Sequence, residues 1–377
     1  MRWQNTICGL LSLSACDGAC QGEPAASPAP SSAAAPSVAP PSPPGPLRIA
    51  YSDWPGWVAW QVAIEERYFE QLGVQVSFEW LEYVPSIEAF SEGKVDGVCM
   101  TNGDALVAGS SGAPSVGILL NDYSSGNDML VARQGIDNVA ALRHRKIAVE
   151  IGFVDHLLLM RALEGAGLTE ADVSIINTKT HEAPDLLRAG SVDAIAAWQP
   201  HSGRALAEGH GAKALFTSAD VPGLIYDLLF VSRSSLKERR ADWMRVVAAW
   251  FRAVDFILAP EHRARAIQIM ARRMGLPEER YAKLMAGTHL LGPEENQRRF
   301  QAAPGLESVQ GSSEIVDRFN VANRVYKDPL LVTPYFDGSL VAEVLGRSET
   351  SERSAPKTRT STDLAGTRPA TAGSSGQ

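Results

Sequence analysis

The sequence predicts an α/β protein with two similar lobes and a ligand cleft between them. Arg48-Ile49-Ala50 returns roughly 97 residues later as Lys146-Ile147-Ala148, and a Gly-x-Val-Asp motif at residues 93–96 returns at 190–193. Each copy alternates strand-like and helix-like segments, which is typical of parallel α/β units. Ligands of such sheets bind beyond the carboxyl ends of the strands, so two facing lobes predict a site between them. The alternative is chance, because Gly and Asp often mark the joins between helices and strands.

The elements of the first copy follow from its apolar periodicity, with Gly73 and Gly93 placed to end helices. The predicted strands lie at residues 47–51, 74–81, 95–100, 116–120 and 129–132, and the predicted helices at 58–72 and 87–92.

The second copy begins with a strand at 146–149 and continues with a helix at 155–166, for which Asp155 is a candidate N-cap and Gly167 a stop. A strand at 192–198 follows. A return strand is expected at 228–232, and the later helices should pack back on the first lobe. These helices are predicted at 242–258, 261–274, 278–285 and 312–326.

The composition is that of an ordinary soluble globular protein, with 45% hydrophobic and 21% charged residues among 377. This length leaves room for about two domains. The net charge of -8 argues against a nucleic-acid partner, whose binding surface would gather Lys and Arg.

The first residues have the features of an export signal. Arg2 is a minimal basic region, and residues 7–15 form an apolar run that is too short to span a membrane. The run ends in Leu13-Ser14-Ala15-Cys16, which resembles a bacterial lipobox and implies a lipid anchor on Cys16 and a periplasmic or cell-surface location. A plain secretory signal is the alternative.

The four cysteines give no reason to expect a disulfide or a metal site. Cys8 would leave with the signal, Cys16 would carry lipid, Cys20 lies in a flexible segment, and Cys99 lies in a predicted buried strand. The Cys and His residues lack the spacing of metal ligands. We expect no metal and no cofactor.

Composition shifts divide the chain further. Residues 21–46 are almost all Pro, Ala and Ser, which favours an extended tether, and residues 348–377 have the composition of a disordered tail. The predicted organisation is a signal peptide at 1–15, a tether at 16–46, a first lobe at 47–132 and 228–347, a second lobe at 133–227, and a tail at 348–377.

Candidate ligand residues follow the strands of the first copy. Asp53, Trp54 and Trp57 come directly after the first strand, and aromatic faces beside a carboxylate suit a small cation or a planar amide. Asn102 and Asp104 follow the third strand, and a later polar run ends at Asp128. The alternatives are structural: tryptophans in the core (as for Trp60), a helix cap, or an Asx turn.

The second copy adds four candidates: Glu150, Asp155, Trp198 and Asp227. A buried carboxylate without a partner costs several kcal/mol, so Glu150 and Asp227 should be exposed or paired with a ligand or an Arg. His156 is expected to be structural. The sequence contains no Gly-x-Ser-x-Gly motif, phosphate-binding loop or metal cluster, which argues against an enzyme.

The motifs Trp54-Pro55-Gly56-Trp57, Gly93-x-Val95-Asp96-Gly97 and Thr101-Asn102-x-Asp104 resemble those of periplasmic solute-binding proteins of the nitrate/sulfonate/taurine/bicarbonate transporter family. The resemblance spans residues 47–346. It implies a type II binding-protein fold with two crossing strands, and delivery of a small solute to an ABC permease. Residues 100–104 and 121–128 resemble a narrower branch encoded near urea carboxylase, for which the implied ligand is urea or guanidine.

The candidate residues depart from what an anion site needs. They are carboxylates and tryptophans, and no Lys or Arg lies among these loop residues. Carboxylates repel sulfonate or nitrate and attract a cation, most strongly when they are desolvated. We therefore expect a small cationic or amide nitrogen compound such as guanidinium or urea.

Other functions remain open at this stage. The ligand could be a sulfonate, nitrate, bicarbonate or an aminopyrimidine. The protein could also be a sensor that presents its ligand to a membrane receptor, or an enzyme like the pyrimidine-synthesising relatives of the fold. The Cys-rich motif of those enzymes is absent. We expect a monomer.

Overall fold

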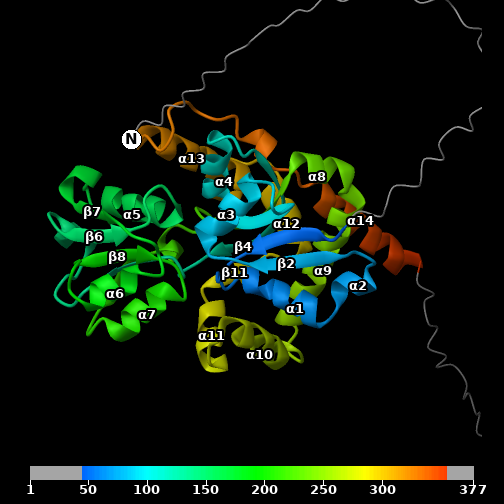
Figure 1. The fold of residues 1–377 in the computed structure, drawn as a ribbon, viewed down its shortest axis with the longest axis horizontal. Coiled ribbons are helices and arrows are strands. Elements are labelled where there is room, and N and C mark those ends of the chain that lie inside the picture. Colours follow the sequence, from blue (N-terminus) through cyan, green and yellow to red (C-terminus); the bar gives the residue numbers. More distant parts are fainter. Residues whose placement is uncertain (1–44, 355–377) are drawn as a thin grey trace, which may run out of the picture. The chain divides into compact units, whose positions relative to one another are not determined.

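Two β-sheets organise residues 45–354, which the computed structural model describes (Figure 1). The first sheet has the order β11-β4-β10-β3-β1-β2, and the second has the order β7-β6-β8-β5-β9. The first contains β1 (Leu47–Tyr51), β2 (Val76–Trp80), β3 (Gly97–Thr101), β4 (Ser115–Ser124), β10 (Tyr226–Ser232) and β11 (Thr288–Leu290). The second contains β5 (Met129–Ala132), β6 (Lys146–Val149), β7 (Ser174–Asn177), β8 (Ala194–Ala197) and β9 (Lys213–Thr217). The predicted two-lobed α/β fold is confirmed.

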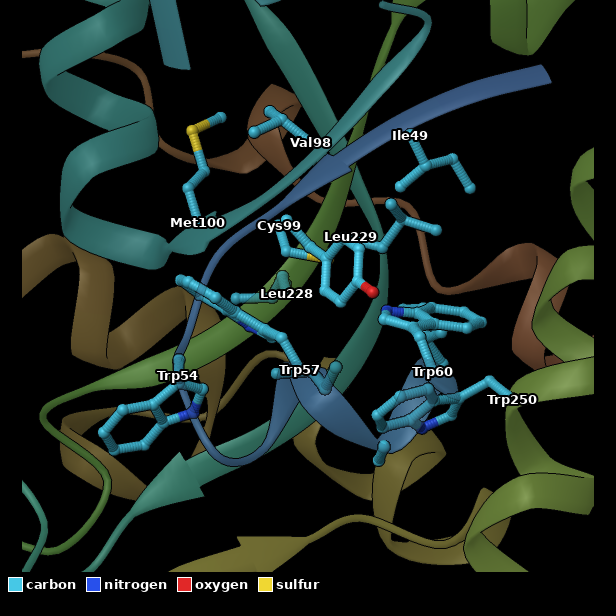
Figure 2. Packing of buried hydrophobic residues seen from close by; sticks show 14 of the residues in the cluster. Ile49, Trp54, Trp57, Trp60, Val98, Cys99, Met100, Leu228, Leu229 and Trp250 are labelled. Carbon is cyan, nitrogen blue, oxygen red and sulfur yellow. The ribbon is translucent and has the colours of Figure 1, made fainter. Parts of the chain in front are cut away.

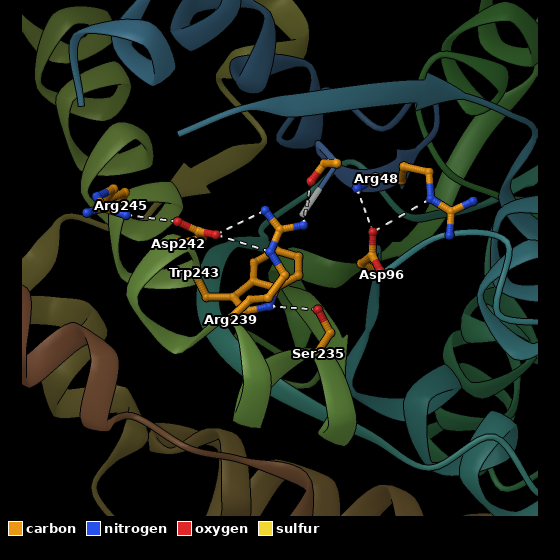
Figure 3. A network of polar contacts seen from close by, with 8 residues as sticks. Arg48, Asp96, Ser235, Arg239, Asp242, Trp243 and Arg245 are labelled. Carbon is orange, nitrogen blue, oxygen red and sulfur yellow. Dashed lines mark hydrogen bonds and ion pairs between the residues drawn. The ribbon is translucent and has the colours of Figure 1, made fainter. Parts of the chain in front are cut away.

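The repeat in the sequence corresponds to the same structure in both lobes. β1 pairs in parallel with β2 and β3, as β6 does with β7 and β8. Asp96 Oδ2 accepts a hydrogen bond of 2.8 Å from the N–H of Arg48, and Asp193 Oδ2 accepts one of 2.9 Å from Lys146. Figure 3 shows the first of these contacts. The Gly-x-Val-Asp motif thus ties the third strand of each copy to its first.

The chain crosses between the sheets twice, and each crossing strand runs antiparallel to its neighbours. β4 ends at Ser124 and β5 begins at Met129 in the other sheet, where it pairs with β8 and β9. β10 returns to the first sheet between β3 and β4. Residues 129–132 lie in the second sheet and Asp227 lies in the first, so the predicted lobe boundaries at these two positions are wrong. The sheet to which a strand belongs depends on its pairing with strands far away in the sequence, and local sequence does not reveal this pairing.

β4 is also longer than predicted. The polar run from Asn121 to Ser124 was expected to be a loop, but it continues the strand because it pairs with both β10 and β11.

Eleven helices accompany the first sheet within the described residues, and the C-terminal ones pack back on this lobe as predicted. The expected helix at 58–72 is interrupted, because Arg67 adopts a left-handed conformation with φ 59°. The eleven helices of the first lobe are α1 (Trp60–Glu65), α2 (Tyr68–Gln71), α3 (Tyr83–Ser91), α4 (Asn102–Ser110), α8 (Arg233–Glu238), α9 (Arg240–Leu258), α10 (Arg263–Met274), α11 (Glu278–Met285), α12 (Pro293–Phe300), α13 (Val309–Ala322) and α14 (Ser339–Ser354).

The second sheet is covered on both faces: by α5 (Val154–Gly165) on one, and by α6 (Ala183–Arg188) and α7 (His201–Glu208) on the other (Figure 1). Gly167, with φ 70°, follows α5 as predicted. Asp155 is not the N-cap, because Phe153 precedes the helix and Asp155 is a buried residue of its first turn.

Aromatic side chains fill the core of the first lobe below β1 and β3 (Figure 2). Trp60 is fully buried and its ring centroid lies 4.5 Å from that of Trp250, so the alternative that placed Trp60 in the core holds. Cys99 is buried here as a free thiol.

A polar network fixes the start of α9 beside the start of β1 (Figure 3). Asp242 accepts hydrogen bonds from both Arg239 and Arg245, and Arg239 also donates to the carbonyl of Gly45. Trp243 Nε1 donates to Ser235 Oγ at 3.0 Å. The long helix is thereby anchored to the first strand of the lobe.

Within residues 45–354, no helix has the length and apolar character needed to cross a membrane. The predicted signal peptide, Cys16 and most of the predicted tether and tail lie outside the described residues.

Candidate functional site

A small buried cavity lies where the two lobes meet, beyond the ends of strands from both sheets. Its volume is about 10 Å³, which is enough space for about one water molecule. First-lobe residues form most of its wall, Asp128 lies in the first crossing, and Val154 and Trp198 belong to the second lobe. The lining residues are Trp54, Trp57, Tyr83, Thr101, Asp128, Val154, Trp198, Ile225 and Asp227.

Four aromatic rings form a continuous chain along this wall. The centroids of Trp54 and Trp57 are 6.5 Å apart, Trp57 stacks on Tyr83 at 5.4 Å, and Tyr83 meets the edge of Trp198 at 5.3 Å. Figure 2 shows Trp54 and Trp57 near the end of β1, apart from the pair Trp60 and Trp250. The wall of the cavity is therefore largely aromatic, and aromatic faces attract cations.

Two aspartates line this cavity, and three more buried aspartates interact electrostatically with them. Asp128 and Asp227 line the wall, and the Oδ2 atom of each has no hydrogen-bond partner among the described residues. Asp104, Asp122 and Asp155 are also buried. Such groups destabilise a protein unless a hydrogen-bond partner or a retained proton satisfies them.

The other three buried carboxyls differ in their partners. Asp104 Oδ2 accepts a hydrogen bond of 2.5 Å from the Tyr83 hydroxyl, and its N–H is capped by Thr101. Asp122 Oδ1 accepts from Trp54 Nε1 at 2.9 Å, while its Oδ2 is unpartnered. Neither carboxyl oxygen of Asp155 has a partner with good hydrogen-bond geometry.

Burial is the main reason that these carboxyls hold protons more tightly than usual. It raises the pKa of Asp104 and of Asp128 to about 7, and that of Asp122 to about 8. The pKa values of Asp155 and Asp227 are raised well above the ordinary value, first by burial and then by the charges of neighbouring aspartates. Near neutral pH the cluster is therefore poised between the protonated and the ionised state.

Asp122 and Asp227 lie opposite each other on neighbouring strands. They are register partners on β4 and β10, and their contact further raises the pKa of Asp227. The chain makes room for them at Gly56, where a Cβ atom would lie 2.0 Å from Asp122 Oδ2.

This close approach gives a direct prediction for Gly56. We expect Gly56→Ala to displace the Asp122 carboxyl from Trp54 and to destabilise the fold by about 1–3 kcal/mol, the usual range for overpacking. Thermal unfolding measures the change. Gly165→Ala is the control, because a Cβ there meets nothing within 4 Å, and an equal loss in both variants would contradict the expectation.

The remaining predicted residues lie elsewhere in the cleft. Asp53 and Glu150 line a larger outer groove of about 730 Å³. Asp53 Oδ2 lies 2.9 Å from His201 Nε2 of the second lobe, and Glu150 Oε2 accepts hydrogen bonds from Thr180. Burial raises the pKa of Glu150.

Asn102 is committed to protein partners. Its Nδ2 donates to Ser312 and Ser313 of α13, and its Oδ1 accepts from the N–H of Tyr226. His156 is buried and accepts from the N–H of Gly152, and burial lowers its pKa, which agrees with a structural role.

Tyr83 lines the cavity but was not among the predicted ligand residues. Tyr83 begins a helix that looks ordinary in sequence, and only the fold brings it between Trp57 and Trp198. The clearest available signal was the polar run at 121–128, which carries both Asp122 and Asp128. Within the described residues, no group of three or more His, Cys, Asp or Glu side chains is arranged to hold a metal ion.

The fold and its cleft define the architecture of a periplasmic binding protein with two α/β lobes. The structure of the periplasmic aliphatic sulphonate binding protein SsuA from Escherichia coli matches 80% of this chain and 100% of its own, with a TM-score of 0.65 and 22% identity. The periplasmic nitrate-binding protein NrtA from Synechocystis PCC 6803 matches 82% of this chain and 90% of its own, with a TM-score of 0.66 and 11% identity. At these identities the likeness concerns the fold alone.

The family follows from the sequence comparison. The model of the NMT1-like family matches residues 40–271, more than half of the chain, so the chain belongs to this family. A relative from Escherichia coli (strain K12), named "Putative aliphatic sulfonates-binding protein", is 27% identical over 243 residues, which cover 63% of this chain and 74% of that protein.

Proposed function

We propose that the protein captures a small nitrogen-containing cation, of the guanidinium type, and delivers it to an ABC importer. The observation that supports the proposal is the pair Asp128 and Asp227, because both residues line the cavity and the buried Oδ2 atom of each has no hydrogen-bond partner among the described residues. The lining described by the structure includes no Lys or Arg. A bound cation would supply the positive charge that balances the carboxylates, and its N–H groups would donate hydrogen bonds to their unpartnered oxygens.

The chemistry of the wall favours guanidinium over neutral or anionic ligands. Guanidinium is planar, carries only donors, and forms paired hydrogen bonds with carboxylates. Its face can lie against an indole, which Trp54 and Trp57 provide at the cavity. Urea shares the shape and most of the donors but lacks the charge, so we expect weaker binding. The resemblance to the branch encoded near urea carboxylase points to the same two compounds.

The relatives favour a second candidate, an anion such as a sulfonate or nitrate, because their names mention these ligands. Protonated carboxyls could donate hydrogen bonds to such an anion, and the raised pKa values of Asp104 and Asp128 make protonation accessible below about pH 7. The second candidate would then bind best in acid.

Isothermal titration calorimetry at pH 8 tests the proposal with guanidinium, urea, taurine, nitrate, bicarbonate and an aminopyrimidine. Guanidinium is expected to bind, urea more weakly, and the anions not at all. Binding of an anion without guanidinium would overturn the cation proposal and retain a solute-binding role. No binding by any compound would favour the sensor or the enzyme alternative, and the expectation that the protein is not an enzyme remains a prediction.

Attachment to the membrane through Cys16 is part of the proposal and has its own test. We expect Cys16→Ala to move the protein from the membrane fraction to the soluble fraction of cells, because the residue that carries the lipid is gone. Fractionation and immunoblotting measure the change, with Cys20→Ala as the matched control. Equal membrane attachment of both variants would contradict a lipid anchor at Cys16.

A further inference from the structure

Two aromatic side chains from opposite lobes separate the acidic cavity from the much larger outer groove. Tyr83 begins α3 of the first lobe, and Trp198 follows β8 of the second lobe. Both line the cavity of about 10 Å³ and also the groove of about 730 Å³. Their rings meet edge to face, with centroids 5.3 Å apart at 77°. This contact is therefore a wall shared by the two spaces.

Tyr83 is the fixed half of the wall. Its hydroxyl donates to Asp104 and accepts a hydrogen bond of 3.1 Å from the N–H of Thr101. Its ring stacks on Trp57 with centroids 5.4 Å apart. Three separate contacts within the first lobe thus hold the ring in place.

Trp198 is the half that the second lobe contributes. It is buried, and besides Tyr83 it meets the ring of His201, with centroids 6.3 Å apart. Because the indole closes the cavity from the second lobe, shortening this side chain would connect the cavity to the groove.

The groove beyond the wall could accommodate more of a ligand. Its lining includes the acidic residues Asp53, Glu82, Glu88 and Glu150 and the apolar residues Val84 and Pro85, together with the basic residues Lys179, His181 and His201. Such a lining tolerates a cation that carries an alkyl group. The contact of Tyr83 with Trp198 lies between the cavity and this space.

We propose that Tyr83 and Trp198 set the size limit of the ligand, so that the site accepts a small unsubstituted cation and rejects its N-alkyl derivatives. This inference rests on the proposed function and deepens it by assigning the residues that determine specificity. An alkyl group can enter only if the two rings part, which leaves the lobes less completely closed around the ligand.

The test compares guanidinium, methylguanidine and butylguanidine by calorimetry on the whole exported protein and two variants. We expect the wild type to bind butylguanidine more weakly than guanidinium by roughly 10- to 100-fold, the range for a group too large for its pocket. Trp198→Ala should reduce this ratio to within a few-fold, chiefly by improving the binding of butylguanidine. Trp198→Phe is the matched control, because it keeps a ring against Tyr83 and should keep most of the discrimination.

The outcomes separate this inference from the proposed function. Wild-type protein that binds guanidinium and butylguanidine equally well would overturn the size limit, whether or not the variants fold. Trp198→Ala that binds guanidinium but still rejects butylguanidine would also overturn it. Failure of the wild type to bind any of the three cations would instead overturn the proposed function, and the size limit with it.

Discussion

Asp128→Asn is expected to abolish binding of a guanidinium-type cation and at the same time to stabilise the unliganded protein at pH 8. Asparagine keeps the shape of the side chain but cannot carry the charge that the ligand needs. Removing one partner of a buried ion pair costs about 3–5 kcal/mol, so the affinity should fall by at least roughly 100-fold. In the unliganded protein the same charge is destabilising, because Asp128 Oδ2 has no hydrogen-bond partner among the described residues.

The gain in stability has a defined pH window. Burial raises the pKa of Asp128 from 3.8 to about 7 in the folded state, so the folded protein binds more protons than the unfolded chain between these values. The stability that this carboxyl group contributes in its protonated form is fully present below about pH 3.8, and it is lost as the pH rises through about 7. At pH 8 the asparagine variant should be more stable by up to about 4 kcal/mol, because the pKa shift is about 3 units and each unit corresponds to 1.36 kcal/mol.

Thermal or urea-induced unfolding at pH 5 and pH 8, together with calorimetry of the ligand, measures both effects. Asp255→Asn is the control, because burial also raises the pKa of Asp255, which lies on α9 outside the cavity. This control should leave the affinity unchanged. An Asp128→Asn protein that binds guanidinium normally would remove Asp128 from the site.

Affinity for the cation is expected to rise steeply between pH 6 and pH 8. The empty site holds protons near neutrality, since the pKa values of Asp104 and Asp128 are about 7 and that of Asp122 is about 8. A bound cation favours the ionised carboxyls and expels these protons. Each released proton makes the affinity change by about tenfold per pH unit below the relevant pKa.

Calorimetry at several pH values, in two buffers with different ionisation enthalpies, counts the protons released on binding. Glu150, His181 and His201 line the groove next to the cavity, so the measured slope is a property of all these groups together. In Asp128→Asn any residual binding should show a shallower slope. A flat profile would contradict a role for these carboxyls, and affinity that rises toward acid would support an anionic ligand.

Local chemistry explains why part of the fold was predictable from the sequence. Gly93 and Gly190 both adopt φ 69°, and Asp96 and Asp193 each bond the backbone of the first strand of their copy, so each motif acts over a short stretch that periodicity reveals. The length of β4 was not predictable in this way. Asn121 and Asp122 look like loop residues, and only pairing with β10 and β11 from far along the chain places them in a strand.

In the candidate site, too, some residues could be predicted from local sequence and others depend on contacts with distant parts of the chain. Trp54 and Asp128 were selected because unusual residues follow predicted strands, and both line the cavity. Tyr83 was missed because nothing in its own segment signals that three other elements converge on it. Asn102 looked equivalent to its neighbours Thr101 and Asp104, but α13, about 210 residues later, engages its amide.

The position of the two lining carboxyls along the chain has a mechanical consequence. Asp128 lies in the four residues that join β4 to β5, and Asp227 is the second residue of β10, directly after the other crossing. If the lobes close by a hinge at these crossings, as the proposed function requires, the ligand is gripped at the pivot. A shift of a fraction of an ångström at the pivot is multiplied by the lever arm of each lobe, so a ligand of a few atoms can drive a displacement at the rim large enough for a membrane partner to detect.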